Sequence, residues 1–256
     1  MSLTVDSGWM AHVLLVSLRI GALFVLTPLF GAAPLPGRVK AFLALALAAA
    51  MVGTMELPAL DTGVLTGTGA MVVASLSELV IGAAMAFGLF AAFAAFQFAG
   101  KLLDVQIGFS LGTVFDPVTR TQAPLLGTLL NLLAVMLFFS LDAHHLLMKA
   151  IAHSLVSLPP GSLPQSWDLA AFADQFGVMF LFGLTIAAPV VFALLLLDVG
   201  LGIASRTMPQ LNIFTVGIPI KIAAGLLVFM GTLAALAPVF GRVFNSVLTF
   251  WQRLGV

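Results

Sequence analysis

The sequence predicts an all-α, membrane-associated protein built from about six long apolar helices. Of its 256 residues, 61% are hydrophobic and only 8% are charged, and the mean hydropathy is +1.19. Soluble domains carry about 25% charged residues, so this composition excludes an ordinary soluble domain and a disordered chain. The net charge of zero, with no basic run, also argues against nucleic-acid binding. Lipid cannot satisfy the edge of a strand, and the alternation of an outer-membrane barrel is absent, so the apolar stretches should be helical.

Six apolar runs account for these helices, because a membrane span needs roughly 20 apolar residues. The runs are residues 9–33, 41–55, 70–100, 125–141, 176–205 and 213–240. A seventh apolar piece, residues 243–251, is too short to cross a bilayer. Stretches rich in proline and glycine, such as residues 34–37 and 159–161, separate the runs. Since there is no internal repeat and no separate soluble segment, residues 1–256 are predicted to form a single domain.

Four ionisable residues interrupt the apolar runs: Arg19, Glu78, Asp198 and Lys221. A charge at the centre of a membrane helix costs about 2.5–3.5 kcal/mol. We therefore expect Arg19 and Glu78 to be buried against protein, with an ion pair between them as one arrangement. Asp198 and Lys221 lie nearer the ends of their runs, where Lys221 can instead extend to the interface. Buried charges beside stretches of small residues indicate helices that contact more protein than lipid, as in a subunit of a larger assembly.

Residues 104–117 form an apolar segment broken by glycine and proline and flanked by charged residues. Each glycine disfavours a helix by up to about 1 kcal/mol, so a loop is expected. An apolar loop in a membrane protein is a candidate constriction, since such constrictions close pores by occlusion or dewetting. A packing loop without a gating role is the alternative.

Residues 206–221 form a second polar connection between apolar runs. Gln210 and Asn212 follow Pro209, and their amides can cap the next helix or hydrogen-bond to a neighbouring one. Gly217 and Pro219 then allow a bend. A simple capped turn would use the same residues.

At these two segments the chain resembles the FliR family, the flagellar export-gate subunit of bacterial type III secretion, and more distantly its injectisome counterparts. Gln106-Ile107-Gly108 followed by Asp116-Pro117 is similar to a glutamine–hydrophobe–glycine stretch of the family that ends in Asp-Pro. The most specific match is the run from Pro209 to Phe214, followed by Gly217 and Pro219. The similarity extends from about residue 15 to about residue 240.

The resemblance implies a gate in which one such subunit joins several copies of FliP and FliQ, with FlhB and FlhA as further partners. Bent helical hairpins would form a closed cone through which unfolded flagellar proteins cross the bacterial inner membrane at the flagellar basal body. The family closes its pore with bulky apolar side chains, for which this chain offers Phe109, Leu111, Val114 and Phe115. The loop frame would be Gln106, Gly108, Gly112, Asp116 and Pro117. Packing between helices or subunits would fall to Pro209, Gln210, Leu211, Asn212, Phe214, Gly217 and Pro219.

The sequence offers little sign of catalysis, so no enzyme activity, cofactor or metal is expected. Cysteine is absent, and there is no phosphate-binding loop or serine-nucleophile motif. Asp142, His144, His145 and His153 could form a metal or proton-relay cluster, but their spacing matches no established ligand motif. The main alternative function is a small-solute secondary transporter with a midplane site near Arg19 and Glu78. Transporters often contain internal repeats, and none is detectable here.

Overall fold

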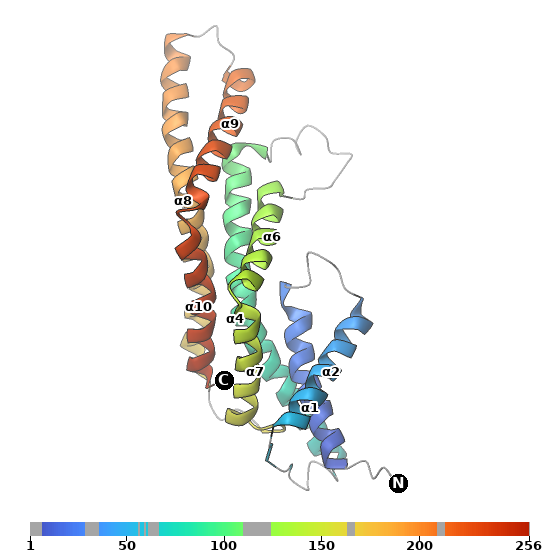
Figure 1. Cartoon of the computed structure of the whole chain (residues 1–256). Coiled ribbons are helices and arrows are strands. Elements are labelled where there is room, and N and C mark those ends of the chain that lie inside the picture. The colour runs from blue at the N-terminus through green and yellow to red at the C-terminus, as the bar shows by residue number, and fades with distance from the viewer. Residues whose placement is uncertain are drawn as a thin grey trace. The chain divides into compact units, whose positions relative to one another are not determined.

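The computed structural model describes residues 7–28, 36–55, 57–58, 60, 67–109, 124–162, 167–208 and 213–255. Within these ranges the chain forms eight α-helices and no strand (Figure 1), which confirms the all-α prediction. The helices are α1 (Ser7–Leu26), α2 (Gly37–Thr54), α4 (Thr68–Ile107), α6 (Leu125–Ser140), α7 (Ala143–Ser157), α8 (Leu169–Thr207), α9 (Ile213–Leu233) and α10 (Ala237–Leu254).

The helix boundaries correct three features of the sequence prediction. α4 continues to Ile107, beyond the predicted end at residue 100, because its charged residues interrupt the apolar run without disfavouring a helix. α7 lies in a stretch that was predicted to be a connection. The sixth run is two helices, because residues 234–236 form a turn between α9 and α10. Pro238, in the first turn of α10, has no backbone N–H and would break a continuous helix at this point.

Five helices are long and apolar enough to cross a membrane, which supports a membrane location. They are α1, α2, α4, α8 and residues 216–233 of α9. α6 and α7 form a sixth candidate, although they are bent by 69° at their junction. The best-covered span is that of α4, of which 67% is buried by the chain itself. The corresponding shares for α2, α8 and α9 are 11%, 28% and 17%, so these helices keep large apolar surfaces uncovered.

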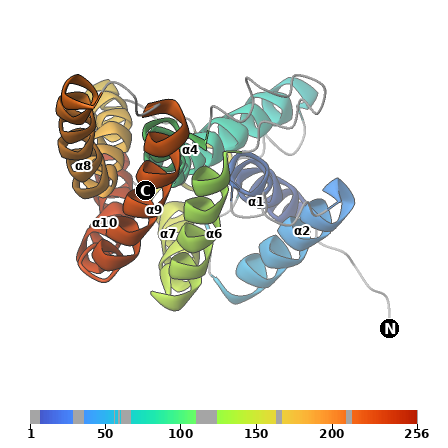
Figure 2. The same ribbon diagram turned by 90° about the horizontal axis from the view of Figure 1, so that it is seen from above.

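The helices contribute to two compact units, and the first consists of residues 1–91, 138–175 and 245–256. In this unit α1 and α2 lie side by side (Figures 1 and 2). The same unit contains an aromatic cluster, in which the rings of Phe87, Phe172 and Phe250 have centroids 5.2–5.9 Å apart. At an exposed edge, Arg253 Nη1 donates a hydrogen bond to Asp174 Oδ2 at 2.7 Å, which together with the Coulomb attraction raises the pKa of Arg253.

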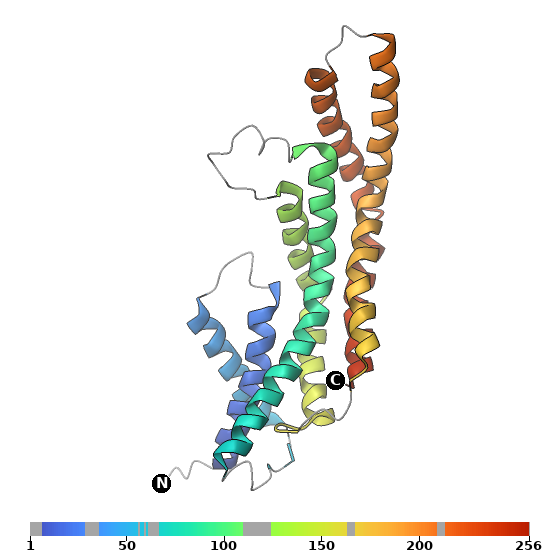
Figure 3. The same cartoon turned by 180° about the vertical axis from the view of Figure 1, so that it is seen from behind.

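The second unit consists of residues 92–137 and 176–244. α4 runs beside α6, and α8 runs beside α9 (Figures 1 and 3). Its aromatic core joins Phe96 of α4 to Phe240 and Phe244 of α10, with ring centroids 5.4 Å and 6.1 Å apart. The close pairing of α4 with α6 positions the ends of the segment that is predicted to be the plug.

Candidate functional site

α4 and α6 provide the two ends of the predicted plug loop. α4 ends at Ile107, where Gly108 adopts a φ of 101° and donates its backbone N–H to the carbonyl of Asp104 at 3.3 Å. A left-handed glycine is the common way to end a helix. Phe109 follows and is half-buried, and Gln106 is half-buried on the last turn of α4. The other predicted plug and frame residues lie outside the described residues: Leu111, Gly112, Val114, Phe115, Asp116 and Pro117.

Asp104 fastens the end of α4 to the start of α6. Its Oδ1 accepts the backbone N–H of Leu126 at 2.9 Å, and its Oδ2 accepts that of Gly127 at 3.1 Å. Pro124, which precedes α6, has no side-chain oxygen to cap these amides, so a carboxylate from another helix does so. The partial positive charge at a helix N-terminus also favours this position for an anion. Asp104 is 5% exposed, so the link is shielded from water.

A contact between two glycines brings α4 and α6 close enough for this link. A Cβ atom on Gly100 would meet the backbone of Gly127, with its nitrogen at 2.6 Å, and the carbonyl oxygen of Leu126 at 2.7 Å. Farther along the same pair of helices, Gln97 Nε2 donates to Asn131 Oδ1 at 3.3 Å. In the sequence, Asp104 stands out only as one of the charges that flank the predicted loop. Its capping role could have been suspected from Pro124, because a helix that follows proline has no capping side chain of its own and needs an acceptor from elsewhere.

In the first unit, Arg19 is held by a complete set of hydrogen bonds. Its Nε and Nη2 donate to Glu78 Oε2 and Oε1 at 2.7 Å and 3.1 Å. Nη1 donates to the carbonyl and the hydroxyl of Ser154 at 2.9 Å and 3.0 Å, and Nη2 also donates to the carbonyl of Leu158 at 2.9 Å. Glu78 Oε1 accepts the backbone N–H of Gly161 at 2.9 Å. Arg19 and Glu78 are 1% and 0% exposed, so this network joins α1, α4 and α7 inside protein.

The close crossing of α1 and α4 depends on Gly82, one turn beyond Glu78. A Cβ atom on Gly82 would collide with the backbone carbonyl of Arg19 and would lie 3.0 Å from the Cβ of Ala22. The absent side chain lets α1 approach until the guanidinium reaches the carboxylate. The network leaves Arg19 no N–H donor for the solute of the transporter alternative, because all five already have acceptors within the chain.

An apolar cavity lies elsewhere in the first unit, between α1, α2 and α4. It has a volume of about 590 Å³ and is lined mainly by small apolar side chains, together with Ser17 and Lys40. Arg19 and Glu78 are absent from its described lining. The cavity is therefore not the site near Arg19 and Glu78 that the transporter alternative predicts.

In the second unit, Asp198 of α8 and Lys221 of α9 form a different kind of ion pair. Lys221 Nζ lies 2.5 Å from Asp198 Oδ1, and the two side chains are 25% and 37% exposed. Two residues before Lys221, Pro219 stands inside α9. Gly225 follows one turn later, and a Cβ atom there would lie 2.7 Å from Cγ1 of Ile107, so α9 packs against the end of α4.

The second predicted motif falls largely outside the described part of the chain. Gly217 and Pro219 lie in α9, as does Phe214, whose side chain is not described. Pro209, Gln210, Leu211 and Asn212 lie outside the described residues.

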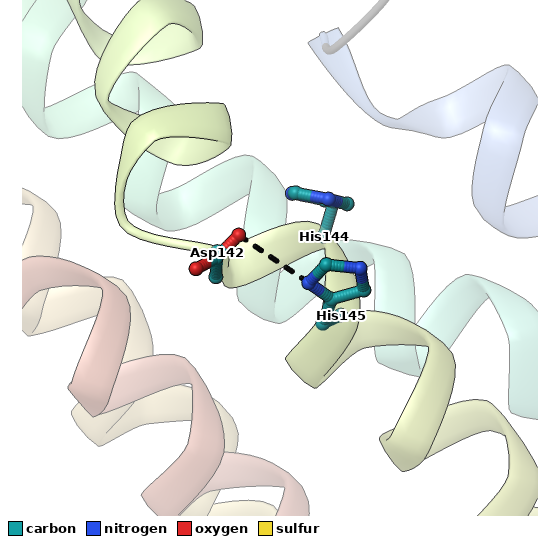
Figure 4. A group of neighbouring side chains, drawn as sticks. All are labelled: Asp142, His144 and His145. Carbon is teal, nitrogen blue, oxygen red and sulfur yellow. Dashed lines mark ion pairs between the residues drawn. The ribbon is translucent and has the colours of Figure 1, made fainter.

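A group with metal-ligand chemistry lies at the junction of α6 and α7 (Figure 4). One potential ligand atom from each of Asp142, His144 and His145 lies within 4.8 Å of the other two. His153 is separate from them and contacts the hydroxyl of Ser157 at 3.3 Å.

Comparison with known proteins identifies the family. Residues 10–247 match the family described as bacterial export proteins, family 1. The chain belongs to this family. As a bacterial export protein it is 34% identical to the flagellar biosynthetic protein FliR of Bacillus subtilis (strain 168) over 245 residues, or 94% of this chain and 93% of the relative. FliR of Escherichia coli (strain K12) is 30% identical over 242 residues, or 93% and 91%.

A relative with a different name extends the comparison beyond the flagellar proteins. Yop proteins translocation protein T of Yersinia pestis is 32% identical over 150 residues, which is 57% of each chain. The matches confirm the resemblance to FliR that the residues around Gln106 and Asn212 indicated. The relatives named here are called biosynthetic or translocation proteins.

Proposed function

We propose that this export protein is a core subunit of the flagellar type III protein export gate. It would act as one domain over residues 1–256, in the bacterial inner membrane at the flagellar basal body. Its role is to complete a closed conduit for unfolded flagellar proteins and to help keep it shut. FliP and FliQ are its proposed partner subunits, with FlhB and FlhA as further partners. This role is structural and requires no catalytic residue or cofactor.

The observation that carries the proposal is the anchored base of the loop between α4 and α6. Asp104 fixes the end of one helix to the start of the other, so the loop begins and ends on a pair of packed helices. Such a base would fix both ends of the segment that carries the bulky apolar side chains. We assign the plug to Phe109, Leu111, Val114 and Phe115, framed by Gln106, Gly108, Gly112, Asp116 and Pro117.

The uncovered helices support a hetero-oligomer. α2, α8 and α9 expose large apolar side chains, including Phe42 at 73%, Met230 at 72% and Leu227 at 71%. Lipid alone could cover such residues, but the partly exposed Asp198–Lys221 pair on α8 and α9 is better covered by protein. We assign the contacts near the start of α9 to the residues of the second motif, which are Pro209, Gln210, Leu211, Asn212, Phe214, Gly217 and Pro219.

Membrane conductance tests the plug. Deleting residues 108–114 should make membranes that contain the assembled complex leaky to ions or small molecules. Replacing the polar loop residues Ser110 and Thr113 by alanine is the matched control and should leave the membranes tight. Unchanged conductance in an intact deletion complex would refute the plug. Assembly is tested separately, because co-expression with FliP and FliQ should yield one particle that contains unlike subunits, whereas a transporter would purify alone.

A further inference from the structure

The corner between α6 and α7 places two histidines and an aspartate together, and the proposed function does not use them. α6 ends at Ser140, α7 begins at Ala143, and the helix axes are bent by 69°. Asp142 forms the corner, while His144 and His145 lie in the first turn of α7 (Figure 4). These three side chains come from one short stretch of the first unit.

The carboxylate of Asp142 faces a histidine side chain of α7 and does not cap the backbone of that helix. An aspartate at this position usually accepts a backbone N–H of the first helical turn. Asp142 instead has a left-handed backbone, with φ 54° and ψ 23°, and makes no capping hydrogen bond to the residues that the structure describes. Its Oδ1 lies 3.3 Å from Nδ1 of His145. The corner therefore directs an anionic ligand atom at an imidazole.

His144 has one ring nitrogen without a hydrogen-bond partner among the described residues. Its Nδ1 is buried, and no residue in the described part of the chain hydrogen-bonds to it. Its ring centroid lies 4.1 Å from that of His145. Buried polar atoms in native proteins nearly always have a partner. An orphaned imidazole nitrogen next to a second imidazole and a carboxylate therefore points to a ligand that accepts lone pairs.

We propose that Asp142, His144 and His145 bind one Zn²⁺ ion at the α6–α7 corner. Imidazole nitrogen with one carboxylate oxygen is a donor set typical of zinc, whereas Ca²⁺ and Mg²⁺ prefer oxygen alone. Zinc bonds of about 2.0–2.2 Å require the ligand atoms to approach one another more closely. Rotation of the side chains permits this, since those of Asp142 and His145 are 74% and 67% exposed. Three protein ligands leave a fourth position for water or for a group from another chain.

Sequence spacing argued against a metal here because Asp-x-His-His corresponds to no established ligand motif. In a regular helix Asp142 and His145 would share a face, since they are three residues apart, whereas His144 would point away from it. In the structure Asp142 has a left-handed backbone just before α7, and one potential ligand atom from each of the three residues lies within 4.8 Å of the other two. A bound ion would tie the corner residue to that turn and stabilise the bend.

Calorimetric titration of the full-length protein tests the site. The protein is purified in detergent with an affinity tag that contains no histidine, treated with a chelator, and titrated with zinc chloride. One Zn²⁺ should bind per chain, and Asp142→Asn, His144→Ala and His145→Ala should each weaken binding about tenfold or more. Asparagine also tolerates a left-handed backbone, so D142N removes the charge without straining the corner. His153→Ala is the matched control on the same helix and should bind like the wild type.

Two further measurements separate lost ligands from lost structure. Circular dichroism should show unchanged helicity in all the variants. Zinc should raise the melting temperature of the wild type and of H153A, but not that of the three ligand variants. Magnesium chloride should give no binding heat, because Mg²⁺ prefers oxygen ligands alone. The site is overturned if the wild type binds no zinc, or if H153A loses binding as H144A and H145A do. These outcomes are independent of pore conductance and subunit assembly, so they leave the proposed gate function untouched.

Discussion

Arg19–Glu78 and Asp198–Lys221 are both ion pairs between long apolar helices, but they differ in how completely the chain surrounds them. The first is buried, bidentate and completed by acceptors on α7 and the turn after it. The second has one described contact at 2.5 Å and leaves both side chains partly exposed. A charge that the chain satisfies by itself serves the fold. A charge left partly exposed among apolar residues needs something outside the chain to cover it.

Removing Arg19 should have the largest effect on stability, because its ion pair is the one that the chain buries completely. Arg19→Leu leaves Glu78 buried without its countercharge, and loss of one partner of a buried pair costs about 3–5 kcal/mol. We expect the variant to lose most of its folded population in detergent, as measured by the thermal melt and by protease resistance. Arg19→Lys keeps the charge but loses the planar fork, so it should fall between R19L and the wild type. A variant R19L as stable as the wild type would show that Glu78 finds other partners.

Gly82→Ala tests whether the close approach of α1 and α4 makes the buried pair possible. The new methyl group would collide with the backbone carbonyl of Arg19, which cannot rotate away. Overpacking of this kind costs about 1–3 kcal/mol. Gly177→Ala in α8 is the matched control, because nothing lies within 4 Å of its Cβ position. Equal melting temperatures for the two variants would mean that α1 and α4 can separate without loss.

Asp104 is a third buried charge, and it differs from both ion pairs because its described partners are backbone amides. Asp104→Ala removes both caps from α6 and should cost about 0.5–2 kcal/mol. Asp104→Asn retains one acceptor oxygen and should cost less. If the plug proposal is correct, hydrogen exchange at residues 125–128 should rise in D104A and the assembled complex should leak. Leakage without faster exchange would contradict a role for Asp104 in anchoring the loop.

The features of the fold that depend on local composition could be predicted from the sequence. Apolar length located six helices, and the scarcity of charge singled out Arg19 and Glu78 as residues that needed protein around them. Hydropathy did not locate α7, and it marked α10 only as an apolar piece at residues 243–251 that is too short to cross a bilayer. The polar residues of α10 lower its mean hydropathy, although the helix buries an apolar face that includes Val243, Val247 and Phe250. Amphipathic helices are recognised by periodicity and not by mean hydropathy.

The candidate site was harder to predict because its geometry is tertiary. The cap that Asp104 provides to α6 joins it to Leu126 and Gly127, which lie 22 and 23 residues farther along the chain. It exists because Gly100 meets Gly127, a contact that neither stretch of sequence signals by itself. The left-handed backbone of Asp142, at the corner before α7, is likewise not signalled by the sequence. Apolar runs can thus be counted from the sequence, whereas contacts between their backbones cannot.

Lys221→Met should have the smallest effect on the stability of the isolated chain. Partly exposed ion pairs contribute about 0–1 kcal/mol, so the melting temperature in detergent should change little. If partner subunits cover this face, the same variant should lower the yield of the complex that co-purifies with FliP and FliQ, because Asp198 would then be buried without its countercharge. The charge-exchanged variant Asp198→Lys with Lys221→Asp keeps the pair but reverses its direction. The isolated variant should have the melting temperature of the wild type. It should assemble poorly if a partner subunit contacts these two charges directly. Normal assembly of both variants would mean that lipid headgroups or water, and not protein, cover the α8–α9 face.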